Sequence, residues 1–353
     1  MKFIKIIISL LLGSFLFVSC MENIDFKGKI TEPMVVVHSF ITTDTTITAR
    51  VSLSRFFLDD TRFDNIDDAE VSVFINGTLK EKMNRIASGQ YRSTYKPSID
   101  DTVRLIVKVP SMKEVSSSPV GFCKPPVVNS VDTTMIMNVK PAFYQINDRG
   151  DTVYSTTNFK INYTLRFTDN VNEKNYYRLV VHIRSHKYIP ISPGFDYWTD
   201  EIINDFYADN FSGYVESVDD KIDSPFTAAD KNSTNPYRIF SDDLFNGRTC
   251  SLTFSSSVYD LFRRIDPSYK YASNRIEKVE ISVYLQAITK EYFFYLQTRT
   301  ASQVDDFLSE PVQVYNNISG GIGFLGSYTS SNVMKFEIGS VPEFMQIVST
   351  IEN

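Results

Sequence analysis

The chain has 353 residues, of which 42% are hydrophobic and 14% are aromatic, with 20 Tyr and 27 Phe against the single Trp198. This richness in residues that favour strands predicts a mainly β protein with a substantial core, and it excludes a disordered chain. The formal net charge is -6 and no basic stripe is present, so nucleic acid is excluded as a partner.

The N-terminus has the pattern of an export signal. Lys2 and Lys5 precede an apolar run over residues 6–18, as in the charged and apolar regions of a signal peptide. The run is too short to cross a bilayer, which takes about 20 apolar residues. We therefore expect the chain to leave the cytoplasm.

The end of this run resembles a lipobox, although Phe17 stands where Leu is usual. Ser19 precedes Cys20, whose thiol would carry the lipid and which would become the first mature residue. This predicts a lipoprotein signal peptide over 1–19 and attachment to the membrane through acyl chains, palmitate among them. Loss of two lysines would lower the net charge from -6 to -8. An ordinary secretory signal is the alternative.

Two further cysteines, Cys123 and Cys250, lie far apart in the sequence. An oxidising compartment permits a disulfide between them, and buried free thiols fit equally well. No Cys-x-x-Cys occurs, so neither redox nor zinc chemistry is indicated.

The mature length suits two domains. Residues 20–33 are predicted to form a tether that ends at a proline, and the first domain covers 34–125. The Pro125-Pro126 pair interrupts the strand pattern, since proline is confined to strand edges and turns, and it marks the boundary. The second domain covers 126–353.

Short strand patterns separated by turns predict an immunoglobulin-like antiparallel β-sandwich for the first domain. Asn76-Gly77 follows the alternating run at 70–75, and this dipeptide is the strongest short hairpin signal. The expected strands are 34–40, 47–53, 70–75, 78–83, 90–95 and 103–109.

A second antiparallel β-sandwich is predicted after the boundary, with a long irregular insertion at 187–236 that contains one helical turn near 200–206. Residues 289–303 lack Gly and Pro and space Tyr292, Tyr295 and Leu296 at helical intervals, which indicates a bracing helix with Thr289 as its N-cap. The expected strands are 131–139, 159–168, 176–183, 248–255 and 278–287.

Metal chemistry has weak candidates. His182 and His186 are four residues apart, but on a strand their rings would be ~13 Å apart, too far to share a zinc ion. The acidic pairs do not match the glycine-containing calcium loop, and turn chemistry is the better interpretation. The acidic residues in question are Asp64 and the pairs at 59–60, 67–68, 219–220, 242–243 and 305–306. We expect no metal, cofactor or catalytic residue.

The insertion carries the best candidates for contact with a partner or ligand, because Tyr and Trp are favoured at interfaces. About half of these aromatic residues would instead fill a local core. The predicted contact residues are Tyr188, Phe195, Tyr197, Trp198, Phe206 and Tyr207.

The one glycine-rich stretch, 320–326, lacks the Lys-Ser/Thr ending of a phosphate loop, so close backbone approach or positive φ is the expected reason for its glycines. Within residues 310–328, Glu-Pro-Val-Gln-Val-Tyr-Asn-Asn-Ile-Ser-Gly-Gly-Ile-Gly-Phe-Leu-Gly-Ser-Tyr resembles the closing signature of a Bacteroidetes outer-membrane lipoprotein family, domain of unknown function 4249. Residues 68–73, 89–91 and 240–243 resemble its other elements. The resemblance implies no activity. It implies an accessory partner that is made alongside TonB-dependent outer-membrane transporters.

These features predict a non-enzymatic outer-membrane lipoprotein that helps a TonB-dependent transporter capture its ligand, on the cell surface or on the periplasmic face. An adhesin or cell-envelope structural module is the alternative. A secreted hydrolase would require a nucleophile-base pair or perturbed acids in a cleft, and no motif indicates one.

Overall fold

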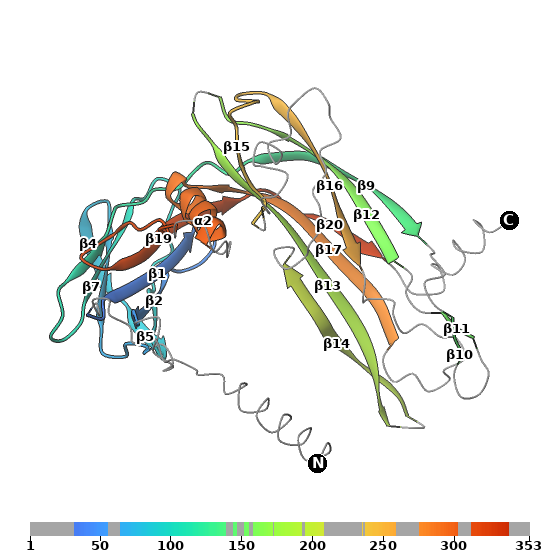
Figure 1. The fold of residues 1–353 in the computed structure, drawn as a ribbon, viewed down its shortest axis with the longest axis horizontal. Coiled ribbons are helices and arrows are strands. Elements are labelled where there is room, and N and C mark those ends of the chain that lie inside the picture. Colours follow the sequence, from blue (N-terminus) through green and yellow to red (C-terminus); the bar gives the residue numbers. More distant parts are fainter. Residues whose placement is uncertain are drawn as a thin grey trace, which may run out of the picture.

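The computed structural model describes residues 32–55, 64–138, 144–146, 152–154, 158–171, 173–192, 195–207, 235, 237–258, 275–302 and 312–338 (Figure 1). Within these residues the protein is mainly β, with one α-helix. Its strands form mostly antiparallel sheets arranged as two β-sandwiches, as the sequence predicts; the pairing of β1 (Val35–Thr42) with β19 (Ile322–Ser330) is parallel. The predicted signal peptide, Cys20 and nearly all of the tether lie outside the described residues.

The first sandwich includes two strands from late in the chain, β18 (Ile318–Ser319) and β19 (Ile322–Ser330). It packs a sheet of order β19-β1-β2-β6-β5 against a sheet of order β18-β8-β7-β3-β4. The predicted hairpin is confirmed, because Asn76 and Gly77 both adopt the positive φ, 52° and 81°, that a tight two-residue turn uses. The strand bounds are β1 (Val35–Thr42), β2 (Thr48–Leu53), β3 (Glu70–Ile75), β4 (Thr78–Lys82), β5 (Asn84–Ala87), β6 (Gln90–Arg92), β7 (Val103–Lys108) and β8 (Val115–Ser117).

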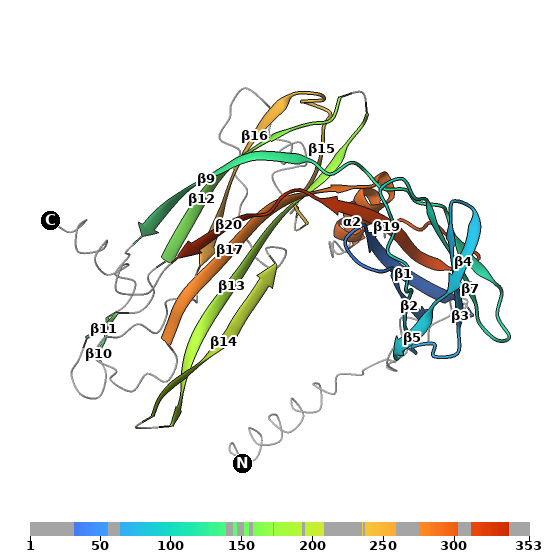
Figure 2. The same ribbon diagram turned by 180° about the vertical axis from the view of Figure 1, so that it is seen from behind.

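The second sandwich packs β14-β13-β17-β20 against β16-β12-β9, which Figure 2 shows from behind. Rings fill the space between the sheets: Tyr163 stacks on Phe254 with centroids 4.9 Å apart. A separate two-stranded sheet joins β10 to β11. The strand bounds are β9 (Val127–Asn138), β10 (Tyr144–Ile146), β11 (Thr152–Tyr154), β12 (Asn158–Thr168), β13 (Tyr176–Ser192), β14 (Phe195–Tyr207), β15 (Ile239–Ser241), β16 (Thr249–Val258), β17 (Arg275–Ile288), β18 (Ile318–Ser319), β19 (Ile322–Ser330) and β20 (Met334–Ile338).

Strand β19 is shared by the two sandwiches. It runs parallel to β1 over seven residue pairs, from Val36 opposite Ile322 to Thr42 opposite Tyr328, and its last residues pair antiparallel with β17. One ten-stranded sheet therefore continues through both units (Figures 1 and 2). The predicted first domain, 34–125, thus takes a strand from 318–330, and Ile318 and Leu325 belong to its buried core.

The glycines of β19 allow this close approach, as expected. Gly323 has φ +130°, and a Cβ placed on it would lie 1.9 Å from the carbonyl oxygen of Val37 on β1. A Cβ on Gly326 would lie 2.0 Å from the ring of Phe324. The glycine-rich stretch is therefore the surface on which β1 and an aromatic ring are packed.

The predicted bracing helix is confirmed as α2 (Lys290–Ser302). It lies over β19 and β1, where Tyr295 stacks on Phe324 with centroids 4.3 Å apart and Phe40 approaches Tyr292 at 5.3 Å. Thr289 begins the helix through its carbonyl, which accepts the N–H of Phe293 at 2.9 Å. Its hydroxyl bonds the backbone of Ser327 on β19, so the predicted side-chain cap is replaced by a contact between helix and sheet.

The prediction of an irregular insertion is wrong for residues 187–192 and 195–207. Strand β13 continues to Ser192, and β14 pairs with it antiparallel, so the expected helical turn near 200–206 is part of a strand. Breaker residues such as Pro190 mislead the sequence pattern here. Pairing with β14 places Pro190 opposite Trp198, and pairing with β17 supports the extended backbone of β13 as far as Tyr188. Residues 208–234 lie outside the described residues.

Cys123 and Cys250 are not joined by a disulfide; Cys250 is buried and Cys123 is half-buried. Burial raises the pKa of Cys123 to about 11, and the charges of Glu173 and Glu291 act in the same direction. The structure thus favours inert thiols over the disulfide that the sequence left open.

Candidate functional site

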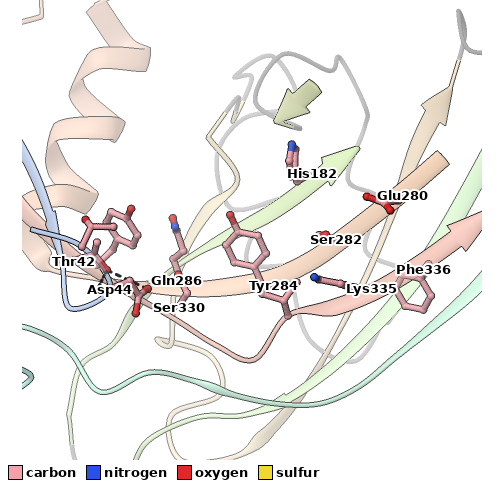
Figure 3. Close-up of a pocket in the computed structure, with 13 residues that line it drawn as sticks. Thr42, Asp44, His182, Glu280, Ser282, Tyr284, Gln286, Ser330, Lys335 and Phe336 are labelled. Carbon is pink, nitrogen blue, oxygen red and sulfur yellow. Dashed lines mark hydrogen bonds between the residues drawn. The ribbon is translucent and has the colours of Figure 1, made fainter. Parts of the chain in front are cut away.

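A pocket of about 670 Å³ lies where the two sandwiches meet (Figure 3). The turn between β1 and β2 contributes Thr42, Asp44 and Thr45 from the first sandwich. Strands β13, β17, β19 and β20 contribute the rest of the lining, so neither sandwich forms the pocket alone.

Strand alternation explains the polar wall formed by β17. Ile281, Val283 and Leu285 point into the core of the second sandwich and are at most 2% exposed. Because successive side chains point to opposite faces, the residues between and beside them face the other way. Figure 3 shows Tyr284 and Gln286 on the pocket side of the strand, and the full set from β17 is Glu280, Ser282, Tyr284 and Gln286.

The wall from the first sandwich is fixed by a turn. The Thr42 hydroxyl donates to the Asp44 carboxylate at 3.4 Å and accepts the Asp44 N–H at 3.3 Å. Thr42 itself stands opposite Tyr328 in the β1 and β19 pairing, so this turn is attached to the shared strand. Asp44 is thereby held in place at the mouth of the pocket.

The lining offers carboxylates, hydroxyls, an amide, one histidine and one lysine around tyrosine rings. Asp44 and Glu280 provide negative charge, Lys335 provides positive charge, and His182 lies on β13. Such a mixture of hydrogen-bonding groups and ring faces suits a polar organic ligand of modest size.

The buried acids of the second sandwich serve its turns. Asp169 accepts hydrogen bonds from the Tyr177 hydroxyl and from the Gly247 N–H, the latter at 2.6 Å. Burial raises the pKa of Tyr177, and its hydrogen bond to Asp169 raises it further. Asp242, 1% exposed, accepts the Asn175 N–H at 2.8 Å, and burial raises its pKa. Neither acid lines the pocket, so these perturbed groups are explained by packing.

The acidic clusters that the structure describes also confirm turn chemistry. Asp67 accepts the Gly89 N–H at 2.7 Å and an Arg85 N–H at 2.9 Å, and Asp243 pairs with Lys174 at 2.7 Å. Within the described ranges, no group of three or more His, Cys, Asp or Glu could hold a metal ion. The clusters at 59–60, 219–220 and 305–306 lie outside those ranges.

The predicted contact residues all lie on the β13 and β14 hairpin, as seen from its backbone. His182, which lines the pocket, is the register partner of Tyr207 on β14, so the hairpin extends from the pocket. His182 and His186 both lie on β13, as the strand interpretation requires. The other predicted residues are spread along the backbone of the hairpin: Tyr188, Phe195, Tyr197, Trp198 and Phe206.

Sequence reasoning missed the pocket itself. The expected strand at 278–287 is β17, but nothing in its pattern predicts that its polar side faces a pocket. A feature of the sequence that could have indicated the pocket is the presence of Tyr284 and Gln286 among the polar positions of 278–287. Asp44 and Thr42 carry no signal, because only the pairing of β1 with β19 brings their turn beside β17.

The fold and the pocket define a class: a tandem β-sandwich protein whose units share one strand and enclose a polar pocket at their junction. The chain belongs to the family described as domain of unknown function (DUF4249), which matches residues 22–333. A comparison with curated proteins found no match. In the part of the chain that the structure describes, no helix has the length and apolar character needed to span a membrane.

The motifs that carry the family resemblance occupy structural joints. The closing glycine segment forms β18 and the shared strand β19, and residues 240–243 form the end of β15 and the turn of the buried Asp242. The family signature thus describes how the two sandwiches are built and joined.

Proposed function

We propose that the protein is a non-enzymatic outer-membrane lipoprotein that acts as an accessory, ligand-capturing partner of a TonB-dependent transporter. The observation that carries this proposal is the polar pocket between two β-sandwiches, because ligand sites form preferentially at domain interfaces. The family match supports it through the resemblance of such lipoproteins to transporter partners.

The junction beside the pocket is firmly held, which supports capture by preformed walls. The Ser327 hydroxyl donates to the Gly121 carbonyl, and the Thr329 hydroxyl donates to the Cys123 carbonyl at 2.9 Å. These bonds attach the connection between the sandwiches to the shared strand. A site that needs little ordering on binding retains more of its contact energy as affinity.

The β13 and β14 hairpin is the proposed contact with the transporter. Among the described strands β14 ends the ten-stranded sheet, so its outer edge offers backbone groups for pairing with an added strand. Tyr197 and Trp198 lie on this strand, and such residues dominate many interfaces. Contact at the hairpin would place the transporter next to the pocket.

Anchoring fits this arrangement. A tether over 20–33 could reach about 50 Å at ~3.5 Å per residue, and the described fold begins directly after it. One acyl chain gives only reversible attachment, whereas several chains make it lasting. The protein would then remain close to a membrane-embedded partner.

The test is a pull-down of the tagged, lipidated protein from gently solubilised outer membranes, with mass spectrometry of the partners. We expect one TonB-dependent transporter in stoichiometric amount. The double variant Tyr197→Ser with Trp198→Ser should lose it, while Leu244→Ser, an exposed apolar residue of the second sandwich, should retain it.

Recovery of the protein alone, from membranes in which such transporters remain intact, would contradict the accessory role. The adhesin or cell-envelope structural module would then become the leading function. Cys20→Ser serves as the anchoring control, because it should abolish lipid labelling and release the protein from the membrane.

A further inference from the structure

A second hollow, separate from the junction pocket, lies on the outer face of the first sandwich. It has a volume of about 810 Å³, and its floor is formed by β1, β2 and β6. Tyr295 and Arg299 of helix α2 form one wall, and Ile86 of β5 lies at the opposite side. We call this hollow the arginine groove.

The floor of the arginine groove presents polar side chains in register. His38 on β1 stands opposite Arg50 on β2, and Arg50 stands opposite Gln90 on β6. Because adjacent strands are about 4.8 Å apart, these three positions form a row across the sheet. Arg92 stands opposite Thr48 in the neighbouring row on the same face.

The wall from α2 adds a third guanidinium. The ring of Tyr295 lies 6.2 Å from the ring of His38, and an N–H of Arg299 lies 3.5 Å from the Tyr295 hydroxyl. Burial lowers the pKa of His38, and the charges of Arg299 and Arg50 lower it further, which places both guanidinium groups close enough to act on the same imidazole.

Charge in the arginine groove is of one sign. Its described lining includes Arg50, Arg92 and Arg299 and contains no carboxylate. The ion pairs recorded among the described residues involve Lys82, Arg85, Lys108, Arg166 and Lys174, and therefore none of these three arginines. A concentration of positive charge of this kind stands out in a chain of net charge -6.

We propose that the arginine groove binds a soluble organic ligand that carries two or more oxyanions, such as carboxylate or sulfate groups, on a ring-bearing body. Guanidinium forks match carboxylate and phosphate-like oxyanions with paired hydrogen bonds. Phe40, which is 39% exposed, provides a ring face for the body of the ligand, and Gln90 provides an amide. A membrane headgroup fits less well, because the arginines line a hollow beside helix α2, whereas a flat bilayer meets protruding groups.

This site differs from the junction pocket in place and in charge, so it stands whether or not the transporter role holds. The probe is trigalacturonate, with galactotriose as the matched sugar without carboxylates, added to the full lipidated protein in a neutral detergent. Calorimetric titration at low salt should give binding of trigalacturonate and none of galactotriose. Raising the salt concentration should weaken the affinity, because exposed charges are screened.

Arg50→Gln with Arg92→Gln should weaken binding at least tenfold. Arg104→Gln is the matched control, because Arg104 is an exposed arginine on β7 in the other sheet of the same sandwich, and its affinity should equal that of the wild type. Thermal unfolding of each variant verifies that the fold is kept.

The histidine signal gives an independent readout in NMR titration. A bound oxyanion would offset the charges of Arg50 and Arg299, so the pKa of His38 should rise on binding in the wild type. Equal weakening by Arg104→Gln, or Arg-dependent binding of phosphatidylglycerol vesicles without binding of trigalacturonate, would overturn the proposal.

Discussion

Thr289 and Ser327 join the start of helix α2 to the shared strand. The Thr289 N–H donates to the Ser327 carbonyl at 3.1 Å, and the Ser327 N–H donates to the Thr289 hydroxyl at 3.3 Å. The Ser327 hydroxyl points the other way, to the Gly121 carbonyl. One fully buried serine thus connects helix, sheet and the link between the sandwiches.

Replacing Ser327 with alanine should destabilise the protein by about 1–3 kcal/mol, because the carbonyl of half-buried Gly121 loses the donor that the buried Ser327 hydroxyl provides. Chemical denaturation followed by fluorescence measures the change. Ser319→Ala, at an exposed position of β18, is the control and should change the free energy of unfolding by less than about 0.5 kcal/mol. Equal stability of the two variants would show that the link does not depend on this bond.

Gly323→Ala should prevent normal folding or cost more than about 3 kcal/mol, since its Cβ would collide with the Val37 carbonyl at a backbone angle that side chains rarely adopt. Gly77→Ala provides the contrast. It too has positive φ, but nothing lies within 4 Å of its Cβ, so the expected cost is about 1 kcal/mol. Soluble yield and melting temperature compare the two variants.

Cys123 should resist alkylation in the native protein. With a pKa of about 11, its thiolate fraction at pH 8 is about a thousandth. Iodoacetamide followed by intact mass should therefore add no label at pH 8 without denaturant and label Cys123 and Cys250 after unfolding. Rapid native labelling, or a mass that indicates a disulfide, would refute the inert thiols.

Two buried aspartates should respond oppositely to replacement by asparagine. Burial alone would raise the pKa of Asp101, but hydrogen bonds from Ser98, Tyr95 and Asn76 together lower it. Its folded value therefore lies below the unfolded one, so its stabilising contribution is present at neutral pH and is lost as pH falls through the folded value. Asp101→Asn should thus be most costly near pH 7 and less costly near pH 3.

Asp242 has the reverse sign, because burial raises its folded pKa above the unfolded one. The protonated form is favoured in the fold, so stability falls as pH rises through the folded value. Asp242→Asn keeps an acceptor for the Asn175 N–H and should be tolerated better at pH 7 than at pH 4. The measurement is the free energy of unfolding of the wild type and of each variant, at pH 7 and pH 3 for Asp101→Asn and at pH 7 and pH 4 for Asp242→Asn. The same direction of change for both variants would contradict the opposite pKa shifts.

The proposed ligand of the junction pocket should bind against the polar face of β17, which forms one wall of the pocket. Tyr284→Ala with Gln286→Ala should reduce ligand uptake by the transporter complex at least tenfold while the pull-down of the transporter is retained. Lys160→Ala, on β12 of the other sheet of the second sandwich, is the control for general effects on that unit. Unchanged uptake would separate the pocket from ligand capture.

Local patterns predicted most strands and the helix. Alternation and the Asn76-Gly77 turn locate β3 and β4, and helical spacing of Tyr292, Tyr295 and Leu296 locates α2, because these signals lie within one short segment. Strand β14 and the part of β13 after residue 183 escaped prediction, since Pro190 and neighbouring breakers lower their apparent strand preference. Part of the support for β13 comes from β17, which lies far along the chain.

The candidate sites were beyond local patterns for the same reason. The junction pocket needs Thr42 beside β17, and the arginine groove needs Arg299 beside Arg50, and both depend on the placement of β19 and α2. The sequence identified the glycines that permit this placement. It contains no comparable sign that the strand they form lies next to β1.

The pairing of β1 with β19 has a consequence for how the protein is made. Strand β1 pairs with residues almost three hundred positions later in the chain. The N-terminal sandwich therefore cannot reach its native form until β19 has been synthesised. Synthesis must be almost complete before the N-terminal sandwich closes. A chain that ends before residue 318 lacks β19, so one edge of β1 keeps unpaired backbone N–H and C=O groups. Such an edge can pair with another chain and promotes aggregation.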